Sequence, residues 1–224
     1  MRGSQMAVER ISGDFPRIDP ARLDAWRDIP VAVAGDSLNR QQVMAARIKP
    51  VAAGMELCGQ AYTINAFEGD NGAIHAALAV IPENVVLVID AGGFENRALW
   101  GGILNTVAMR RKVAGVVIDG AVRDSDELRE HGLPVFAAAI SPAGPSKGWG
   151  GSLNGIVSCG NVAVQPGDII RGDADGVVAI PLGREQQAHA TACERLALEK
   201  DALARVEKGE DTAVIFGAPP IIDI

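Results

Sequence analysis

Two adjacent charged residues, Arg123 and Asp124, close the segment Asp119-Gly-Ala-Val-Arg-Asp124, directly after an apolar run. A guanidinium is a planar fork that can bind a carboxylate or an oxo group through two hydrogen bonds. A carboxylate with water suits Mg²⁺ or Mn²⁺, which prefer oxygen ligands and often take only one or two from the protein. The pair therefore predicts a site for a divalent metal and a small anion. The alternatives are a structural ion pair or the N-cap of a helix.

Glycines mark a second candidate site. Asp90-Ala-Gly-Gly93 follows an apolar run, and Trp100-Gly-Gly-Ile-Leu104 follows a few residues later, where a helix is expected to begin. Glycines at a helix N-terminus let a ligand approach free backbone N–H groups, and the helix dipole favours an anion by about 0.3–1 kcal/mol at exposed sites. A substrate carboxylate would fit this place. The alternative is a tight strand–helix turn with close packing.

The remaining polar motifs predict no further site. Asp173-Ala-Asp-Gly176 begins like a calcium loop, but valines follow it directly, so it predicts a hairpin turn. The histidines have neither HxxxH nor HExxH spacing and are expected to be non-catalytic; they are His75, His131 and His189. No serine stands in a G-x-S-x-G elbow.

Positioning these candidates requires strands and helices in alternation. Three apolar runs are typical of strands buried on both faces: residues 85–89, 113–118 and 135–140. Helical patterns lie between and beside them, at residues 71–80, 102–111 and 125–131. This alternation predicts βαβ units of an α/β fold, in which ligands gather at the carboxyl ends of the strands.

The flanking segments are less regular. Residues 20–48 hold two short helical patterns, the second with Val43, Met44 and Ile48 on one face, and residues 56–64 are rich in strand formers. The Gly-, Pro- and Ser-rich residues 141–155 predict a lid, a binding loop or an interface arm.

Short strands and a long helix are expected towards the C-terminus. Residues 161–180 predict short strands joined by turns, and residues 184–208 predict a long amphipathic helix. The apolar tail, residues 215–224, predicts docking on a neighbouring subunit.

Composition narrows the class of protein. The chain has 224 residues, 48% of them hydrophobic, so residues 7–224 are expected to form one domain, after a tag remnant at residues 1–6. A net charge of −7 and only 4% aromatic residues argue against nucleic-acid binding. The apolar stretches are much shorter than the roughly 20 residues that cross a membrane. The widely spaced cysteines, Cys58, Cys159 and Cys193, predict free thiols, so a cytoplasmic location is expected.

Six motifs occur in the order of a known family. They are Gly92-Gly93, Ala98-Leu-Trp-Gly-Gly-Ile-Leu104, Gly115-Val-Val-Ile-Asp-Gly-Ala-Val-Arg-Asp124, Leu133-Pro-Val-Phe136, Gln165-Pro-Gly-Asp-Ile-Ile170 and Asp175-Gly-Val-Val-Ala-Ile-Pro181. From about residue 30 to 181 the chain resembles the family of the RNase E activity regulator A (RraA-like) and the class II 4-hydroxy-4-methyl-2-oxoglutarate aldolases. The pattern Asp-Gly-x-x-Arg-Asp, with the Trp-Gly-Gly-x-Leu loop before it, is specific.

The resemblance implies a compact α/β sandwich with a swivelling-domain-like β core. It also implies a homo-oligomer, trimer or hexamer, with sites at subunit interfaces. Aldolase members cleave 4-hydroxy-4-methyl-2-oxoglutarate or 4-carboxy-4-hydroxy-2-oxoadipate to pyruvate and a second oxo acid, and they decarboxylate oxaloacetate. The regulator branch implies an alternative function, a non-catalytic protein that binds RNase E-type RNA-degradation partners.

The resemblance also assigns roles by position. Asp124 would hold a divalent metal, mostly through water, and Arg123 would bind the 2-oxo acid and stabilise the enolate oxygen. The substrate carboxylate would lie on the backbone amides of Gly101, Gly102, Ile103 and Leu104. Carbon–carbon cleavage and decarboxylation both leave a pyruvate enolate, whose charge a chelated Mg²⁺ or Mn²⁺ spreads. Glu194 and Glu199 are the candidates for an acidic residue that a neighbouring subunit's C-terminal helix adds.

Overall fold

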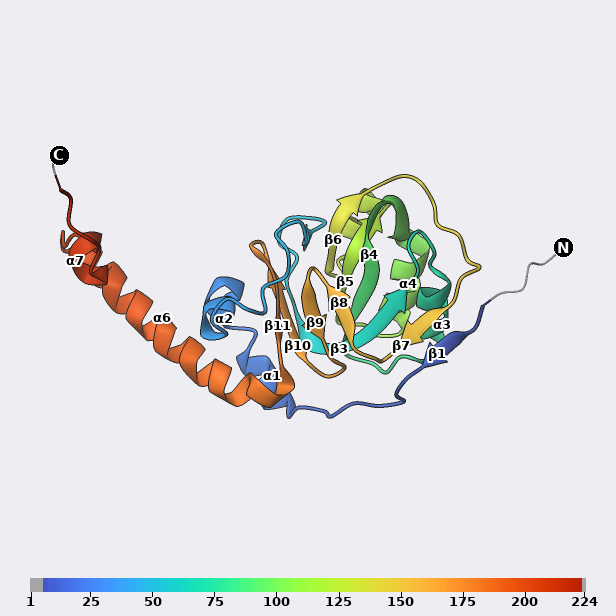
Figure 1. Ribbon diagram of the computed structural model, residues 1–224, viewed down its shortest axis with the longest axis horizontal. Coiled ribbons are helices and arrows are strands. Elements are labelled where there is room, and N and C mark those ends of the chain that lie inside the picture. The colour runs from blue at the N-terminus through green and yellow to red at the C-terminus, as the bar shows by residue number, and fades with distance from the viewer. Residues whose placement is uncertain (1–5, 223–224) are drawn as a thin grey trace.

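Four parallel strands with helices between them form the centre of the structure (Figure 1). The strands are β3 (Leu57–Ala66), β4 (Val85–Trp100), β5 (Gly115–Val122) and β6 (Val135–Ile140), and the connecting helices are α3 (Gly72–Val80), α4 (Gly102–Arg110) and α5 (Ser125–His131). The predicted βαβ alternation and the α/β class are confirmed. The computed structural model describes residues 6–222, so residues 1–5 of the expected tag remnant lie outside the described residues.

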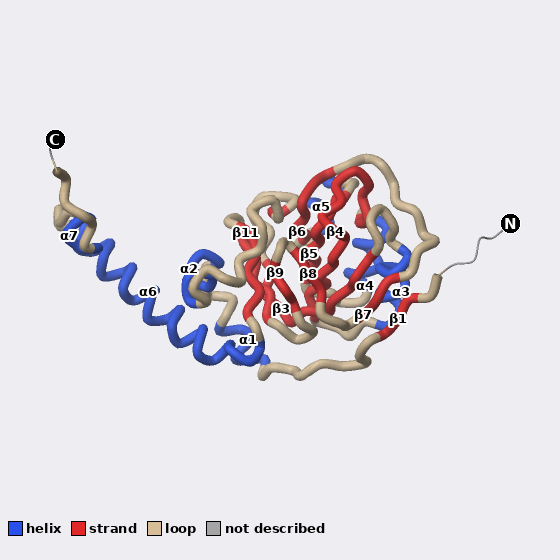
Figure 2. The backbone as a smooth tube through the Cα atoms, viewed as in Figure 1, coloured by secondary structure: helices blue, strands red, loops and turns tan. Residues whose placement is uncertain are grey.

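Shorter strands extend the sheet on both sides (Figure 2). The strand order is β1-β7-β3-β4-β5-β6-β2, with β1 (Val8–Arg10), β7 (Gly151–Leu153) and β2 (Lys49–Pro50). The hairpin of β10 (Ile169–Asp173) and β11 (Gly176–Ile180) pairs with β3, and β8 (Val157–Cys159) pairs separately with β9 (Val162–Val164). Asp173 faces Gly176 across the end of the hairpin, as the turn motif predicted.

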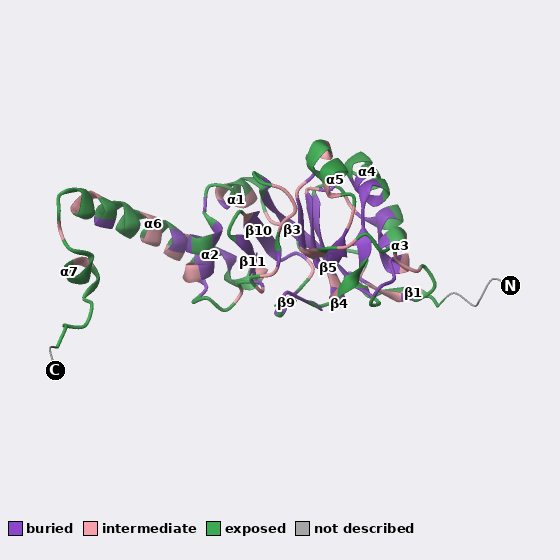
Figure 3. Cartoon of the chain, turned by 90° about the horizontal axis from the view of Figure 1, so that it is seen from above, coloured by how far each residue is buried: buried purple, intermediate pink, exposed green. Residues whose placement is uncertain are grey.

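The apolar runs are continuous because both faces of the central strands are covered. Leu87 and Ile89 pack with α3, α4 and α5 on one face, whereas Val86 and Val88 pack on the other with β8, β9, β10 and β11. Buried residues therefore lie on both sides of the sheet (Figure 3). This arrangement is the α/β sandwich that the family resemblance implied.

One predicted helix, with Val43, Met44 and Ile48 on a shared face, is wrong. The helices before the sheet are α1 (Pro20–Ala25) and α2 (Val31–Ser37), and the chain is irregular after them. The Met44 N–H donates to the carbonyl of Val177 at 2.9 Å, and the Ala45 N–H donates to that of Gly160 at 2.8 Å. Because these groups bond to distant strands and turns, a local helix cannot form there.

The predicted C-terminal helix is confirmed as α6 (Glu185–Glu207), which follows the 3₁₀ turn η1 (Leu182–Arg184) and precedes α7 (Thr212–Phe216). Its first turns pack on α2, and the rest projects away from the sheet (Figure 1). Leu198, Leu203 and Phe216 are each more than 60% exposed along this arm. No helix in residues 6–222 combines the length and the apolar character that crossing a membrane requires.

Candidate active site

Arg123 and the glycine turn before α4 lie side by side, because β4 and β5 are parallel neighbours that end together. Trp100 pairs with Val122 in the last register position, and the Arg123 N–H donates to the Trp100 carbonyl at 2.9 Å. Gly101 and Arg123 each follow their strand by one residue. The sheet thus brings together the two candidates that the sequence placed more than twenty residues apart.

Asp124 uses its side chain outside its own helix. It stands at the N-cap of α5 with a left-handed backbone (φ 58°), but its carboxylate makes no cap hydrogen bond. Instead, Oδ2 accepts a hydrogen bond from the Gly102 N–H at 3.0 Å. A left-handed backbone at a residue other than glycine costs free energy, although Asp tolerates it better than most residues. The N-cap alternative is therefore correct for the position of Asp124 but not for its side chain.

The Arg123–Asp124 ion pair is a weak explanation for this geometry. Arg123 Nε lies 3.6 Å from Asp124 Oδ2, and both side chains are 40% exposed. Pairs this open contribute little to stability. A Cβ on Gly101 would lie 2.6 Å from Asp124 Oδ2, and one on Gly144 would lie 3.0 Å from Arg123 Nη1. Glycines therefore leave room for both charged groups at the same opening.

A cavity of about 90 Å³ opens beside the pair. The predicted residues Gly101, Ile103 and Leu104 line it, together with Arg123 and Asp124. Sequence reasoning missed four other lining residues, namely Asn71 at the N-cap of α3, His75 of α3, and Pro145 and Lys147 of the loop at 141–155. The loop at 141–155 therefore forms part of the cavity wall, and its expected role in binding stays a prediction. No local pattern identifies these residues, because only the fold brings them to the cavity.

The cavity carries positive charge from Arg123 and Lys147 and negative charge from Asp124. Burial lowers the pKa of His75, and the charge of Lys147 lowers it further. Both effects favour the neutral form of the His75 imidazole. Two cations and helix N–H groups together suit an anion with one or two carboxylates.

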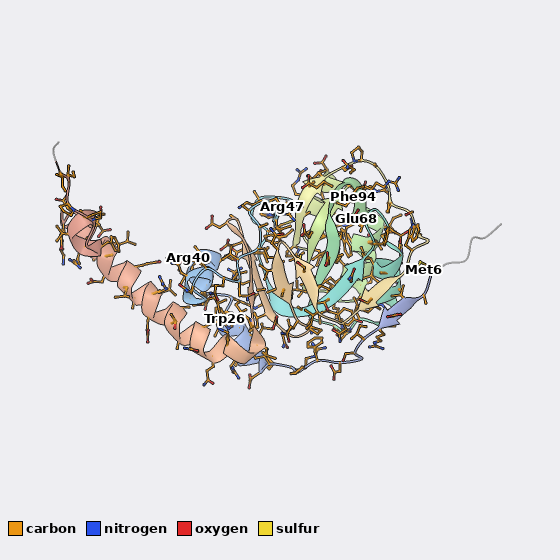
Figure 4. The ribbon with its side chains drawn as sticks, in the orientation of Figure 1. Met6, Trp26, Arg40, Arg47, Glu68 and Phe94 are labelled. Atoms are coloured by element: carbon orange, nitrogen blue, oxygen red, sulfur yellow. The ribbon has the colours of Figure 1, made fainter. Side chains whose placement is uncertain are left out.

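A larger cavity, about 600 Å³, is a poorer match to an anion. Its carboxylates come from Glu9, Glu68 and Asp90, and no Lys or Arg of residues 6–222 lines it. Phe67 and Trp149 stack beside it with ring centroids 4.9 Å apart. Met6 and Glu68, labelled in Figure 4, belong to this cavity. We therefore place the candidate site in the smaller cavity, on chemistry rather than size.

The expected strand end at Asp90-Ala-Gly-Gly93 is wrong. β4 continues to Trp100 through register shifts against β5 between Asp90 and Trp100. Asp90 accepts hydrogen bonds from the Gly92 and Ser158 N–H groups, at 3.0 and 3.1 Å. Because Asp90 bonds to the backbone of its own turn and of β8, it serves the turn structure.

Asp119, the first residue of the Arg–Asp motif, lies apart from the cavity. Its carboxylate accepts hydrogen bonds from Arg47 Nη2 at 2.7 and 2.9 Å and from the Gly160 N–H at 2.8 Å. Figure 4 labels Arg47, on the loop before β2. Asp119 is buried inside β5 and fixes the turn between β8 and β9.

Asp70 fixes the backbone of the loop at 141–155, which lines the smaller cavity. Its carboxylate accepts hydrogen bonds from the N–H groups of Gly72 at 2.8 Å, Gly148 at 2.7 Å and Trp149 at 3.3 Å. Burial raises the pKa of Asp70, but these backbone hydrogen bonds outweigh burial and lower it below its ordinary value. Because Lys147 directly precedes Gly148, Asp70 also positions the Lys147 side chain at the cavity.

We expect Asp70→Asn to lower the free energy of unfolding at pH 7 by roughly 1.5–3 kcal/mol, since a buried charged acceptor is lost. The folded pKa lies below the ordinary value of 3.8. The contribution of Asp70 is therefore fully present above that value and is lost as the pH falls through the folded pKa. Urea unfolding of wild type and variant should show the difference at pH 7 and its decrease below pH 3.8. Asp126→Asn, at an exposed helix position, is the control; an equal effect there would contradict the role of Asp70.

A divalent metal fits Asp124 only as a partly hydrated ion. In the part of the chain that the structure describes, Asp124 is the one carboxylate that lines the smaller cavity. Across residues 6–222, no group of three or more His, Cys, Asp or Glu side chains could hold a metal ion. This donor set excludes a closed, all-protein site but fits Mg²⁺ or Mn²⁺, which keep several waters and bind through one or two carboxylates plus substrate. Glu194 and Glu199 lie on α6, which projects away from the side where α3 and α4 lie (Figures 1 and 3).

The fold and the site together define an α/β sandwich protein with a candidate anion-binding cavity at its strand ends. Residues 24–179 match the family described as RraA-like (aldolase/RraA). A protein of Halalkalibacterium halodurans, provisionally named 4-hydroxy-4-methyl-2-oxoglutarate aldolase, is 35% identical over 164 residues, which cover 73% of this chain and 78% of that protein. The chain belongs to the aldolase/RraA family.

Two solved structures are similar to this one. The RNA-processing inhibitor RraA from Thermus thermophilis is 28% identical, with a TM-score of 0.63 over 69% of this chain and 93% of that one. RraAS2 of Streptomyces coelicolor, described as an unusual member of the RNase ES inhibitor RraA family, is 24% identical, with a TM-score of 0.76 over 84% of this chain and 98% of that one. The second likeness concerns the fold alone. The family thus includes proteins named as aldolases and proteins named as inhibitors.

Proposed function

We propose that this protein is a divalent-metal-dependent carbon–carbon lyase that acts on pyruvate-type 2-oxo acids. Its substrates would be 4-hydroxy-4-methyl-2-oxoglutarate or 4-carboxy-4-hydroxy-2-oxoadipate, each cleaved to pyruvate and a second oxo acid, and oxaloacetate, which it would decarboxylate. The observation that carries the proposal is the meeting of Arg123, Asp124 and the start of α4 in one cavity. The name of the Halalkalibacterium relative supports the same class.

The residues of the cavity suit the chemistry of an enolate. The N–H groups of the first helical turn lack partners within the helix. Gly102 gives its N–H to Asp124, so those of Ile103 and Leu104 would bind the substrate carboxylate. The Arg123 guanidinium would donate to the 2-oxo oxygen and stabilise its negative charge as the carbon–carbon bond breaks. Asp124 would hold the divalent cation mostly through water, and the bound cation would supply further positive charge beside the substrate oxygens.

Oxaloacetate is the substrate whose reaction tests this arrangement most simply. Loss of CO₂ leaves the bonding electron pair on the pyruvyl fragment, and water can supply the proton that completes pyruvate. Lys147, on the same cavity, would pair with a second substrate carboxylate. Its presence favours dicarboxylic over monocarboxylic 2-oxo acids.

The test is pyruvate release from oxaloacetate, with Mg²⁺ or Mn²⁺ and after EDTA. We expect turnover that EDTA abolishes and added metal restores, measured with a coupled lactate dehydrogenase assay and corrected for metal-only decarboxylation. Enzyme-dependent turnover that resists EDTA would contradict the metal. No turnover on any of the three substrates would favour the alternative, a protein-binding regulator of RNase E-type RNA degradation like the inhibitors of the same family.

We further propose a homo-oligomer, trimer or hexamer, in which the arm of α6 and α7 docks on a neighbouring subunit. Leu203, Val214 and Ile221 are each at least 65% exposed along the arm, and apolar side chains in such a row are typical of an interface. Light scattering should give three or six times the chain mass of 23.3 kDa. A stable, active monomer would contradict the proposal. The free cysteines of the described chain fit the expected cytoplasmic location.

A further inference from the structure

Asp124, the N-cap of α5, and Glu127, in its first turn, have the spacing of a helix cap, but both carboxylates lie against α4. Asp124 is the N-cap and Glu127 stands three residues later, as in a capping box, where each side chain would bond to the other residue's backbone N–H. The Asp124 carboxylate instead accepts the Gly102 N–H. The Glu127 carboxylate lies against the same glycine, and a Cβ built on Gly102 would overlap it. Both carboxylates therefore meet at the first residue of α4.

A series of contacts between polar side chains leads from the core to Glu127. The indole N–H of Trp100 donates to Asn105 Oδ1 at 3.2 Å, and Asn105 Nδ2 lies 3.2 Å from His131 Nδ1. His131 Nε2 then lies 3.7 Å from Glu127 Oε1. This series of side-chain contacts begins at Trp100 and returns, through Glu127, to Gly102. The contacts therefore surround the start of α4.

The hydrogen bonds in this series of contacts have only one consistent assignment of donors and acceptors. An indole N–H can only donate, so the Asn105 oxygen is the acceptor and its amide NH₂ must donate to His131 Nδ1. In a neutral His131 the proton is therefore on Nε2, which faces Glu127. Trp100 and Asn105 are fully buried, so the order is fixed from the core outward.

The simplest alternative is an ordinary surface pair between Glu127 and His131, one turn apart on α5. Such i,i+4 pairs on a helix surface contribute little to stability. That alternative accounts for the contact of these two residues but not for the position of the carboxylate on Gly102. It also leaves unexplained why a buried Trp–Asn pair fixes the histidine.

We propose that Glu127 is a second carboxylate of the Asp124 site, with His131 and Asn105 as its positioning residues. It accepts hydrogen bonds from water molecules on the divalent cation that Asp124 would hold, so the inference rests on the proposed function. Mg²⁺ and Mn²⁺ retain waters when one carboxylate binds them, and those waters need acceptors. Both carboxylates contact Gly102, which places Glu127 within reach of that water layer.

The experiment is Mn²⁺ binding to the full-length protein, measured from the electron paramagnetic resonance signal of free Mn²⁺. We expect Glu127→Gln to raise the Mn²⁺ Kd about 10–100-fold, the usual effect of losing an outer hydrogen-bond partner of a metal site. Asp126→Asn is the matched control, because Asp126 is 83% exposed and pairs only with Arg129 among the described residues. Its Kd should stay within about two-fold of wild type.

A rescue variant separates a metal role from a structural one. The Cβ of residue 102 would point at the Glu127 carboxylate, so Gly102→Asp combined with Glu127→Ala, which clears that space, supplies a carboxylate at nearly the same place. We expect this double variant to recover Mn²⁺ affinity, which a purely structural Glu127 would not allow. Equal Kd values for wild type and Glu127→Gln would overturn the role of Glu127 and leave the proposed function intact. Absence of Mn²⁺ binding by the wild type, with EDTA-resistant turnover, would overturn both.

Discussion

Asp124→Ala is expected to abolish metal-dependent decarboxylation of oxaloacetate. Among the described residues, Asp124 is the only carboxylate that lines the cavity, so its removal leaves the cation without a protein ligand there. Loss of a Lewis acid removes several kcal/mol of transition-state stabilisation, and 4 kcal/mol corresponds to roughly 10³-fold in kcat. The measurement is pyruvate release under saturating Mn²⁺.

Asp124→Asn separates charge from structure. An Asn tolerates the left-handed backbone of this position and can still accept the Gly102 N–H, but it carries no charge. We expect its melting temperature to stay near that of wild type while its turnover falls almost as far as that of Asp124→Ala. Near-wild-type turnover in both variants would contradict the assignment of the metal to Asp124.

Arg123→Lys is expected to lower kcat/KM by roughly 2.7–4 kcal/mol, or about 10²–10³-fold, by comparison with the loss of a single oxyanion donor. Lysine keeps the charge but loses the planar fork that would donate to the 2-oxo oxygen. The backbone hydrogen bond from residue 123 to Trp100 is unaffected, so the sheet end should persist. Steady-state kinetics with oxaloacetate measure the effect.

The control for this variant is Arg129→Lys, on the exposed face of α5. It should leave both kcat and KM close to wild type. If Arg123→Lys did the same, Arg123 would have only a structural role, and the proposed enolate chemistry would lose its main cation.

The amino-acid sequence by itself determined the central layers of this protein. Continuous β-branched runs such as residues 85–89 predict strands covered on both faces, because neither face can be left in water. Parallel strands end at one edge, so the sequence predicts both the Trp100–Leu104 loop and the Arg123–Asp124 pair near the carboxyl ends of strands, although it places the end of β4 at Asp90 rather than at Trp100. The motif resemblance rested on these same segments, which is why family and fold were recognisable before the structure.

The sequence did not correctly predict the segments whose backbone groups bond to distant parts of the chain. Residues 43–48 have a helical spacing of apolar side chains, but their N–H groups bond to β11 and to the β8–β9 turn. Residues 90–100 contain glycines and polar residues, yet they remain in β4 because β5 continues to pair with them through register shifts. A local pattern carries no information on partners supplied by another part of the chain.

Only the tertiary structure decided what surrounds Arg123 and Asp124. Lys147 reaches the cavity because Asp70, far earlier in the chain, binds the backbone of the next residue, and His75 arrives on a different helix. Glu127 has the spacing of a helix cap, and sequence alone would assign it to its own helix. The packing of α4 against α5 turns it towards Gly102 instead, because glycine is the one residue that leaves space there for a carboxylate.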